Sequence, residues 1–238
     1  MRKLSILFTV IIVAIIVISV FVSHLPIVTN ESVDLLVYQS NQNIYNSYYP
    51  VNSPYVVINA RGTRQQNDGS GFYITSNVVA TCEHILEFDN ITVNGNRATV
   101  LSRNISKDIA LLKVSVENTK YLKLSPITVQ QGQPITVYSN PLKLNNTMSI
   151  GIISNPSRMI NDERNPVIQF TAPVSAGSSG GAIINKDGEV IGMVKETISA
   201  GQLLNFAIPA SQIQQELNNI TSDANNEDYS NYNYYGDY

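Results

Sequence analysis

The sequence predicts an all-β domain, preceded by one membrane-spanning helix and followed by a short helix. Three observations support this prediction. Short runs of β-branched and other apolar residues recur between residues 55 and 208, separated by turn residues, which is typical of a β-sandwich or a β-barrel. An apolar run fills residues 4–22, and a helix-capping pattern begins at Ser211. The spacing of the runs does not choose between a sandwich and a barrel.

The N-terminal run is long enough to cross a bilayer. Residues 4–22 contain only three weakly polar side chains, so the run approaches the roughly 20 residues of a spanning helix and exceeds the about 7–15 of a signal-peptide core. Arg2 and Lys3 precede it, which places the N-terminus in the cytoplasm. We expect a single-pass signal anchor over residues 1–23 in the cell membrane, with the remaining chain extracytoplasmic. Secretion after signal cleavage is the alternative.

After this run the chain contains one domain and two polar flanks. Residues 24–49 are rich in Asn, Ser and Tyr, and we interpret them as a stalk. The remaining length is sufficient for one domain with a sizeable core. The β-rich runs within it are residues 55–59, 72–75, 78–81, 109–114, 135–138, 148–154, 167–171, 190–194 and 203–208.

A short C-terminal helix is predicted from residue 211. Ser211 and Gln214 form a capping box, and Ile213, Leu217 and Ile220 share one helical face. We expect this helix to pack on the second half of the domain. Residues 221–238 are acidic, aromatic and of low complexity, so we expect a disordered tail.

Composition argues against several classes of partner. The net charge is −3 and the body of the chain has no basic cluster, which argues against nucleic-acid binding. Cys82 is the only cysteine, so no intramolecular disulfide can form, and a buried thiol is expected. His84 is the only histidine beyond the N-terminal region. One cysteine and one histidine make a zinc site improbable, and we expect no metal and no cofactor.

The residues that point to chemistry lie in three segments. Ser179 is the centre of a small-residue turn, Ala176–Ala182, which can expose a nucleophilic hydroxyl beside backbone N–H groups. His84 follows an apolar strand, and Asp108 begins another. Each residue alone is more often structural. The chain order His, Asp, Ser is that of the chymotrypsin-type triad.

Seven segments between about residues 50 and 218 resemble successive signatures of HtrA-type, trypsin-like serine proteases. These signatures are Gly69–Ile74, Thr81–His84, Asp108–Lys113, Ser149–Ser154, Gly177–Gly181, Gly188–Gly192 and Asn205–Pro209. The resemblance implies a domain over residues 50–220 with two six-stranded antiparallel β-barrels, about 50–125 and 126–220. It places the active site in the cleft between the barrels.

The resemblance also implies roles for individual residues. Ser179 would be the nucleophile, His84 the general base and acid, and Asp108 the orienting carboxylate. The backbone N–H groups of Gly177 and Ser179 would form the oxyanion hole. The implied substrate-binding residues are Thr171, Pro173, Val174, Ala176, Lys195, Glu196 and Thr197. No aspartate lies in residues 171–176, so we expect small or aliphatic residues at the cleavage position. Glu196 could alter this preference if its side chain reaches the pocket.

The sequence departs from the family pattern beside the histidine, where Cys82 and Glu83 stand. Glu83 could raise the basicity of His84, but we expect it to face solvent. Ser178 stands where the family commonly has asparagine, and Ala182 where it commonly has proline. Both replacements are conservative for a tight turn. We expect no PDZ module in this chain. A homotrimer is compatible with the resemblance, although the sequence does not determine the oligomeric state.

These observations together predict a membrane-anchored, extracytoplasmic serine endopeptidase that acts on polypeptides, with protein quality control as one setting. A narrow processing protease for one partner on the same membrane is a variant of this hypothesis. The alternative from another class is a protease-fold protein that is inactive or conditionally active, and that serves as a binding or chaperone-like module. A misformed loop around residues 176–179 would produce it.

Overall fold

The computed structural model describes residues 53–160, 165–198 and 201–230, all in one compact unit of the chain. The predicted anchor over residues 1–23, the stalk over 24–49 and the final residues 231–238 lie outside the described part. Within the described part, no helix is both long and apolar enough to cross a membrane.

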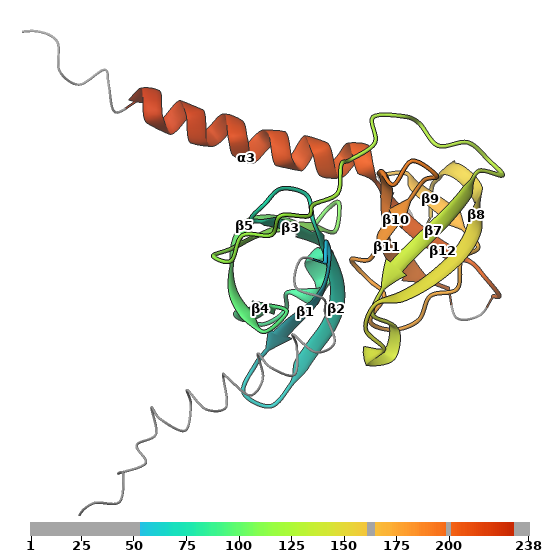
Figure 1. Cartoon of the computed structure of the whole chain (residues 1–238), viewed down its shortest axis with the longest axis horizontal. Helices are drawn as coiled ribbons and strands as arrows, with labels where there is room; N and C mark the ends of the chain where they lie inside the picture. Colours follow the sequence, from blue (N-terminus) through green and yellow to red (C-terminus); the bar gives the residue numbers. More distant parts are fainter. Residues whose placement is uncertain (1–52, 161–164, 199–200, 231–238) are drawn as a thin grey trace, which may run out of the picture. The chain divides into compact units, whose positions relative to one another are not determined.

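The first barrel is formed by the N-terminal half of the described chain (Figure 1). Its strands are β1 (Tyr55–Arg61), β2 (Gln66–Tyr73), β3 (Val78–Thr81), β4 (Asn90–Val93), β5 (Asn96–Asn104) and β6 (Ile109–Val114). They follow the order β1-β2-β3-β6-β5-β4, and antiparallel pairing of β1 with β4 closes the barrel. The 3₁₀ helix η1 (Glu83–Ile85) follows β3 directly.

The second barrel repeats this architecture. Its strands are β7 (Pro134–Ser139), β8 (Thr147–Arg158), β9 (Val167–Phe170), β10 (Ala182–Ile184), β11 (Val190–Thr197) and β12 (Asn205–Pro209). The order is β10-β11-β12-β9-β8-β7, and pairing of β10 with β7 closes it. The 3₁₀ helix η2 (Pro141–Lys143) connects β7 and β8. The prediction of two six-stranded antiparallel barrels is therefore confirmed for the described residues, and the sandwich alternative is wrong.

Three strands were not among the runs singled out from the sequence. β4 and β10 are only four and three residues long. β5 alternates partly buried and exposed residues, and it contains Arg and Asn. Short or polar strands of this kind form because their neighbours close a barrel, and their own sequences show little apolar periodicity.

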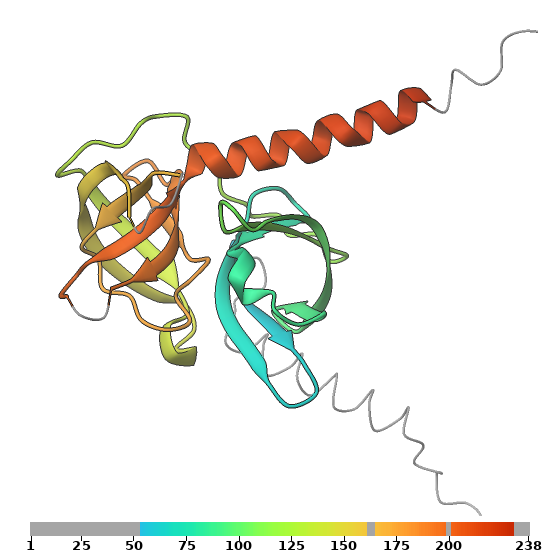
Figure 2. The same ribbon diagram turned by 180° about the vertical axis from the view of Figure 1, so that it is seen from behind.

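The C-terminal helix α3 (Ala210–Ser230) differs from its prediction in two respects. It is long rather than short, so residues 221–230 are helical and the disordered tail predicted from residue 221 is wrong for them. It also contacts both barrels, not the second alone (Figure 1 and Figure 2). Ile213 joins a core cluster that contains residues of both barrels. The buried carboxylate of Glu216 accepts hydrogen bonds from Ser102 Oγ and Asn104 Nδ2 of β5.

Candidate active site

The ends of two neighbouring strands bring His84 and Asp108 together. β3 pairs with β6 up to Thr81 and Ala110, so η1 after β3 and the residue before β6 meet at one edge of the barrel. His84 Nδ1 lies 3.0 Å from Asp108 Oδ1 and 2.9 Å from Oδ2. The backbone N–H of His84 also donates to Oδ1, at 2.9 Å. The side chain of Asp108 is 13% exposed and that of His84 is 51% exposed.

This contact determines the chemistry of the imidazole. An ionised carboxylate only accepts hydrogen bonds, so Nδ1 carries the proton and Nε2 keeps its lone pair. The hydrogen bond to Asp108 raises the pKa of His84, burial lowers it, and the negative charges of Asp108, Glu83 and Glu196 raise it further. The net result is a pKa above the ordinary value, which makes Nε2 a stronger base.

Ser179 lies on a turn that is held by both barrels. The backbone N–H of Ser70 in β2 donates to Ser179 O at 2.8 Å, and Gly180 N–H donates to Val194 O at 2.8 Å. Gly180 has φ +84°, and a Cβ there would lie 2.0 Å from Ser70 O. Only glycine permits this approach of the turn to β2.

The backbone before Ser179 is fixed so that the N–H groups of Gly177 and Ser179 remain available. Ala176 O accepts from Leu142 N–H at 2.7 Å, and Gly177 O accepts from Ser70 Oγ at 2.8 Å. Within the described chain, the amides of Gly177 and Ser179 donate no hydrogen bond. Two free N–H groups beside a serine hydroxyl can stabilise an oxyanion.

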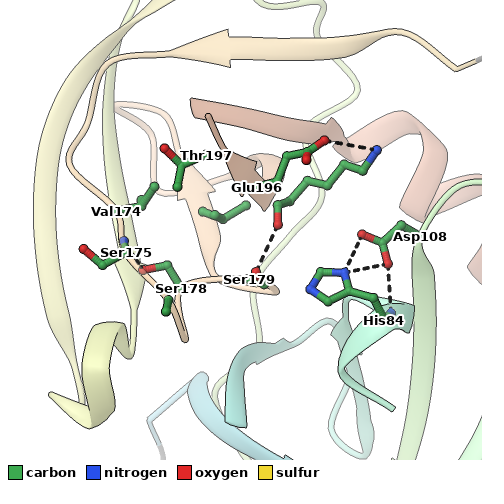
Figure 3. Close-up of a pocket in the computed structure, with 11 residues that line it drawn as sticks. His84, Asp108, Val174, Ser175, Ser178, Ser179, Glu196 and Thr197 are labelled. Atoms are coloured by element: carbon green, nitrogen blue, oxygen red, sulfur yellow. Dashed lines mark hydrogen bonds and ion pairs between the residues drawn. The ribbon is translucent and has the colours of Figure 1, made fainter. Parts of the chain in front are cut away.

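The hydroxyl of Ser179 is not directed at His84. Ser179 Oγ donates to Lys195 O at 3.0 Å, and the described residues show no hydrogen bond from it to His84. In Figure 3 the imidazole of His84 lies between Asp108 and Ser179. Rotation of the Ser179 side chain is therefore required before His84 can accept its proton, and such adjustment on substrate binding is common.

A cavity of about 360 Å³ begins at these residues. Its lining comprises His84, Asp108, Val174, Ser175, Ala176, Ser178, Ser179, Val194, Lys195, Glu196 and Thr197. Five of the seven predicted substrate-binding residues are among them, whereas Thr171 and Pro173 are not. Thr171 Oγ1 accepts from Ile152 N–H, and Pro173 O accepts from Ser149 Oγ. Glu196 does reach the cavity, where its carboxylate lies 3.6 Å from Lys195 Nζ.

A second cavity of about 640 Å³ shares His84, Ala176 and Ser179 with the first. It is lined by Gln66, Asn67, Asp68, His84, Ile85, Leu142, Lys143, Ala176, Gly177 and Ser179. An ion pair of 3.0 Å between Lys143 Nζ and Asp68 Oδ2 joins η2 to β2 beside this cavity. Sequence reasoning missed six of these residues, which lie at the start of β2 and in η1 and η2 and carry no motif: Gln66, Asn67, Asp68, Ile85, Leu142 and Lys143.

The described residues also contain one group of atoms close enough to share a metal ion. These atoms belong to Cys82, His84 and Asp108 and lie within 4.8 Å of one another. The thiol of Cys82 donates to Val194 O at 3.2 Å, and burial raises its pKa well above the ordinary value. His84 Nδ1 and the carboxylate of Asp108 are already hydrogen-bonded to each other. This donor set fits a hydrogen-bonded relay, and we assign no metal site to it.

Comparisons with known proteins show what this chain is similar to. Residues 69–193, more than half of the chain, match a family described as trypsin-like peptidase domain. The chain is 35% identical over 157 residues to a serine protease HtrA-like protein of Staphylococcus haemolyticus (54% of this chain, 24% of that protein). It is 30% identical over 164 residues to mitochondrial serine protease HTRA2 of Drosophila virilis (62% and 38%).

The chain thus spans less than half the length of each of these relatives. Among solved structures, the active form of the Rv3671c protease of M. tuberculosis superposes with a TM-score of 0.66 at 25% identity, over 71% of this chain and 82% of that one.

Proposed function

Because this chain belongs to the trypsin-like peptidase family, we propose that it is a serine endopeptidase with Ser179 as nucleophile, His84 as general base and Asp108 as orienting carboxylate. One observation supports this most strongly. A hydrogen-bonded imidazole and carboxylate line the first cavity together with Ser179, and Gly177 and Ser179, whose amides are free, line the second. Each meets one requirement of acyl transfer.

The proposed reaction uses these groups in sequence. Ser179 Oγ attacks the substrate carbonyl carbon while His84 Nε2 accepts the hydroxyl proton. The amides of Gly177 and Ser179 stabilise the oxyanion. When the intermediate collapses, the peptide C–N bond breaks, and the leaving amine takes the proton from His84. Water then attacks the acyl-enzyme and gives a proton to His84, which returns it to Ser179 as the acid leaves. Asp108 remains ionised throughout.

We extend the proposal to the setting of the enzyme. The apolar run over residues 4–22, with Arg2 and Lys3 before it, supports a membrane-anchored protease that faces away from the cytoplasm. Serine proteases of the HtrA type among its relatives support polypeptide substrates and protein quality control as the role. One observation favours conditional activity instead. The Ser179 hydroxyl donates a hydrogen bond to Lys195 O rather than to His84.

Covalent labelling tests the proposal. The full chain is treated with a fluorophosphonate probe, and the modified residue is mapped by mass spectrometry. We expect one adduct on Ser179, no adduct in Ser179→Ala or His84→Ala, and full labelling in Ser157→Ala, which replaces an exposed serine outside both cavities. An adduct on another residue, or a folded chain that forms none, contradicts the proposed function and favours the binding role.

The first cavity supports a preference for small or aliphatic side chains at the cleavage position. Val174, Ala176 and Val194 provide apolar walls, while the carboxylate of Glu196 faces Lys195. In a peptide library we expect kcat/KM for valine or alanine at this position to exceed that for lysine or arginine by at least about tenfold. Glu196→Gln should leave this preference unchanged. A preference for basic residues that disappears in Glu196→Gln would refute it.

A further inference from the structure

We infer that Glu83 and Arg103 act as a positioning pair for His84: they hold the turn that carries the imidazole and balance the charge beside it. The inference rests on the proposed role of His84 as the base. It also corrects the expectation that Glu83 faces solvent, because Glu83 is buried, with 9% of its surface exposed.

One guanidinium group holds both ends of η1. Arg103 extends from β5, and its Nε and Nη2 donate to Glu83 Oε1 at 2.9 and 2.6 Å. The same Nη2 donates to Leu86 O at 2.8 Å. Glu83 is the first residue of η1 and Leu86 its C-cap. His84 lies between these two anchors, so the backbone that carries its ring is fixed to the barrel wall at both ends.

Burial of the Glu83 carboxylate makes this contact different from a surface ion pair, although the Arg103 side chain is 43% exposed. Exposed pairs contribute little because water competes for both charges. The side chain of Glu83 is only 11% exposed, and a buried carboxylate without a cationic partner is costly. Arg103 is therefore needed for Glu83 to occupy this position, and removing either side chain leaves the other charge uncompensated next to His84.

The charges around His84 come from every element packed near it. They are Glu83 and Glu87 on its own segment, Arg103 on β5, Asp108 before β6, Lys195 and Glu196 on β11, and Asp68 and Lys143 beside the second cavity. Glu83 is among the groups whose negative charge raises the pKa of His84. A negative neighbour favours the imidazolium, and a positive neighbour disfavours it.

Replacing Glu83 and replacing Arg103 should shift the pKa of His84 in opposite directions. Glu83→Gln removes a negative charge and leaves Arg103 unpaired, so the pKa of His84 should fall. Arg103→Gln leaves Glu83 unpaired, so the pKa should rise. We expect shifts of about half a pH unit in each direction. The double variant should return close to the parent value. Loosening of η1 should also reduce the maximal labelling rate by about tenfold in either single variant.

Two measurements on the full chain test these expectations. Nuclear magnetic resonance titration of the histidine rings gives the pKa of His84 directly, and His24 is the only other histidine to assign. The second measurement is the pH profile of the second-order rate constant for fluorophosphonate labelling of Ser179. The rise of this profile on the acidic side gives the same pKa, and its plateau at higher pH reports how well His84 is positioned. Arg103→Lys separates the two effects, because it keeps the charge but cannot hold both anchors. Its acidic limb should match the parent while its plateau falls.

Lys123→Gln and Glu189→Gln are the matched controls, because they break an ion pair of 2.8 Å that lines neither cavity. Both control variants should leave the acidic side and the plateau of the pH–rate profile unchanged. Shifts of the same sign in Glu83→Gln and Arg103→Gln, or no shift in either folded variant, would overturn the inference. The titration of His84 remains measurable if Ser179 proves unreactive. Failure of the proposed function and failure of this inference are therefore distinguishable.

Discussion

An Asp108→Asn variant is expected to hydrolyse peptides with kcat reduced by about 10⁴-fold, at nearly unchanged KM. Asp108 accepts the Nδ1 proton of His84 through both carboxylate oxygens. An asparagine can present its NH₂ group to Nδ1, which favours the tautomer with the proton on Nε2. Nε2 is then unable to accept the proton of Ser179. The hydrogen bond to Asp108 is also the largest cause of the raised His84 pKa, so this pKa should fall in the variant.

Steady-state kinetics with a cleavable peptide, measured from pH 5 to 9, check this expectation. Asp187→Asn serves as the control, because Asp187 forms an exposed ion pair with Lys186 and lines neither cavity. Its kcat should equal that of the parent. A kcat within tenfold of the parent for Asp108→Asn would show that Asp108 does not orient the base. A large rise in KM would indicate a role in substrate binding instead.

A Gly180→Ala variant is expected to lose labelling of Ser179 and more than about 3 kcal/mol in the free energy of unfolding. The added Cβ would lie 2.0 Å from Ser70 O and 2.6 Å from Thr81 Oγ1. Ser70 belongs to a core strand of the first barrel, so neither the strand nor the turn can move without loss of other contacts. The positive φ of Gly180 adds backbone strain.

The control for this variant isolates the steric effect. Gly188 has a similar φ of +78°, but a Cβ there meets nothing within 4 Å. Gly188→Ala should therefore cost only the strain, about 1–2 kcal/mol, and should be labelled normally. Urea unfolding and probe labelling measure both quantities. Equal destabilisation of the two variants would mean that the approach of Gly180 to β2 is not required for the site.

Part of the site was predictable because it depends on local sequence. The glycines around Ser179 permit a tight turn, and the apolar runs before His84 and after Asp108 place these residues at strand ends. Apolar periodicity and turn residues act between near neighbours, so they are visible in the sequence. The all-β class and the C-terminal helix were predicted for the same reason.

The sequence determined which residues are candidates for the chemistry and the order in which they occur. Only the tertiary structure decided how they are held. Packing between the barrels brings Ser70 to Gly177, strand pairing within the first barrel brings Arg103 to Glu83, and docking of α3 brings Glu216 to β5. These partners are 107, 20 and 112 residues apart along the chain. Hydrogen bonds across such separations depend on strand pairing and burial, which no short segment encodes. The orientation of the Gly177 and Ser179 amides, the burial of Glu83 and the docking of α3 are therefore properties of the folded chain.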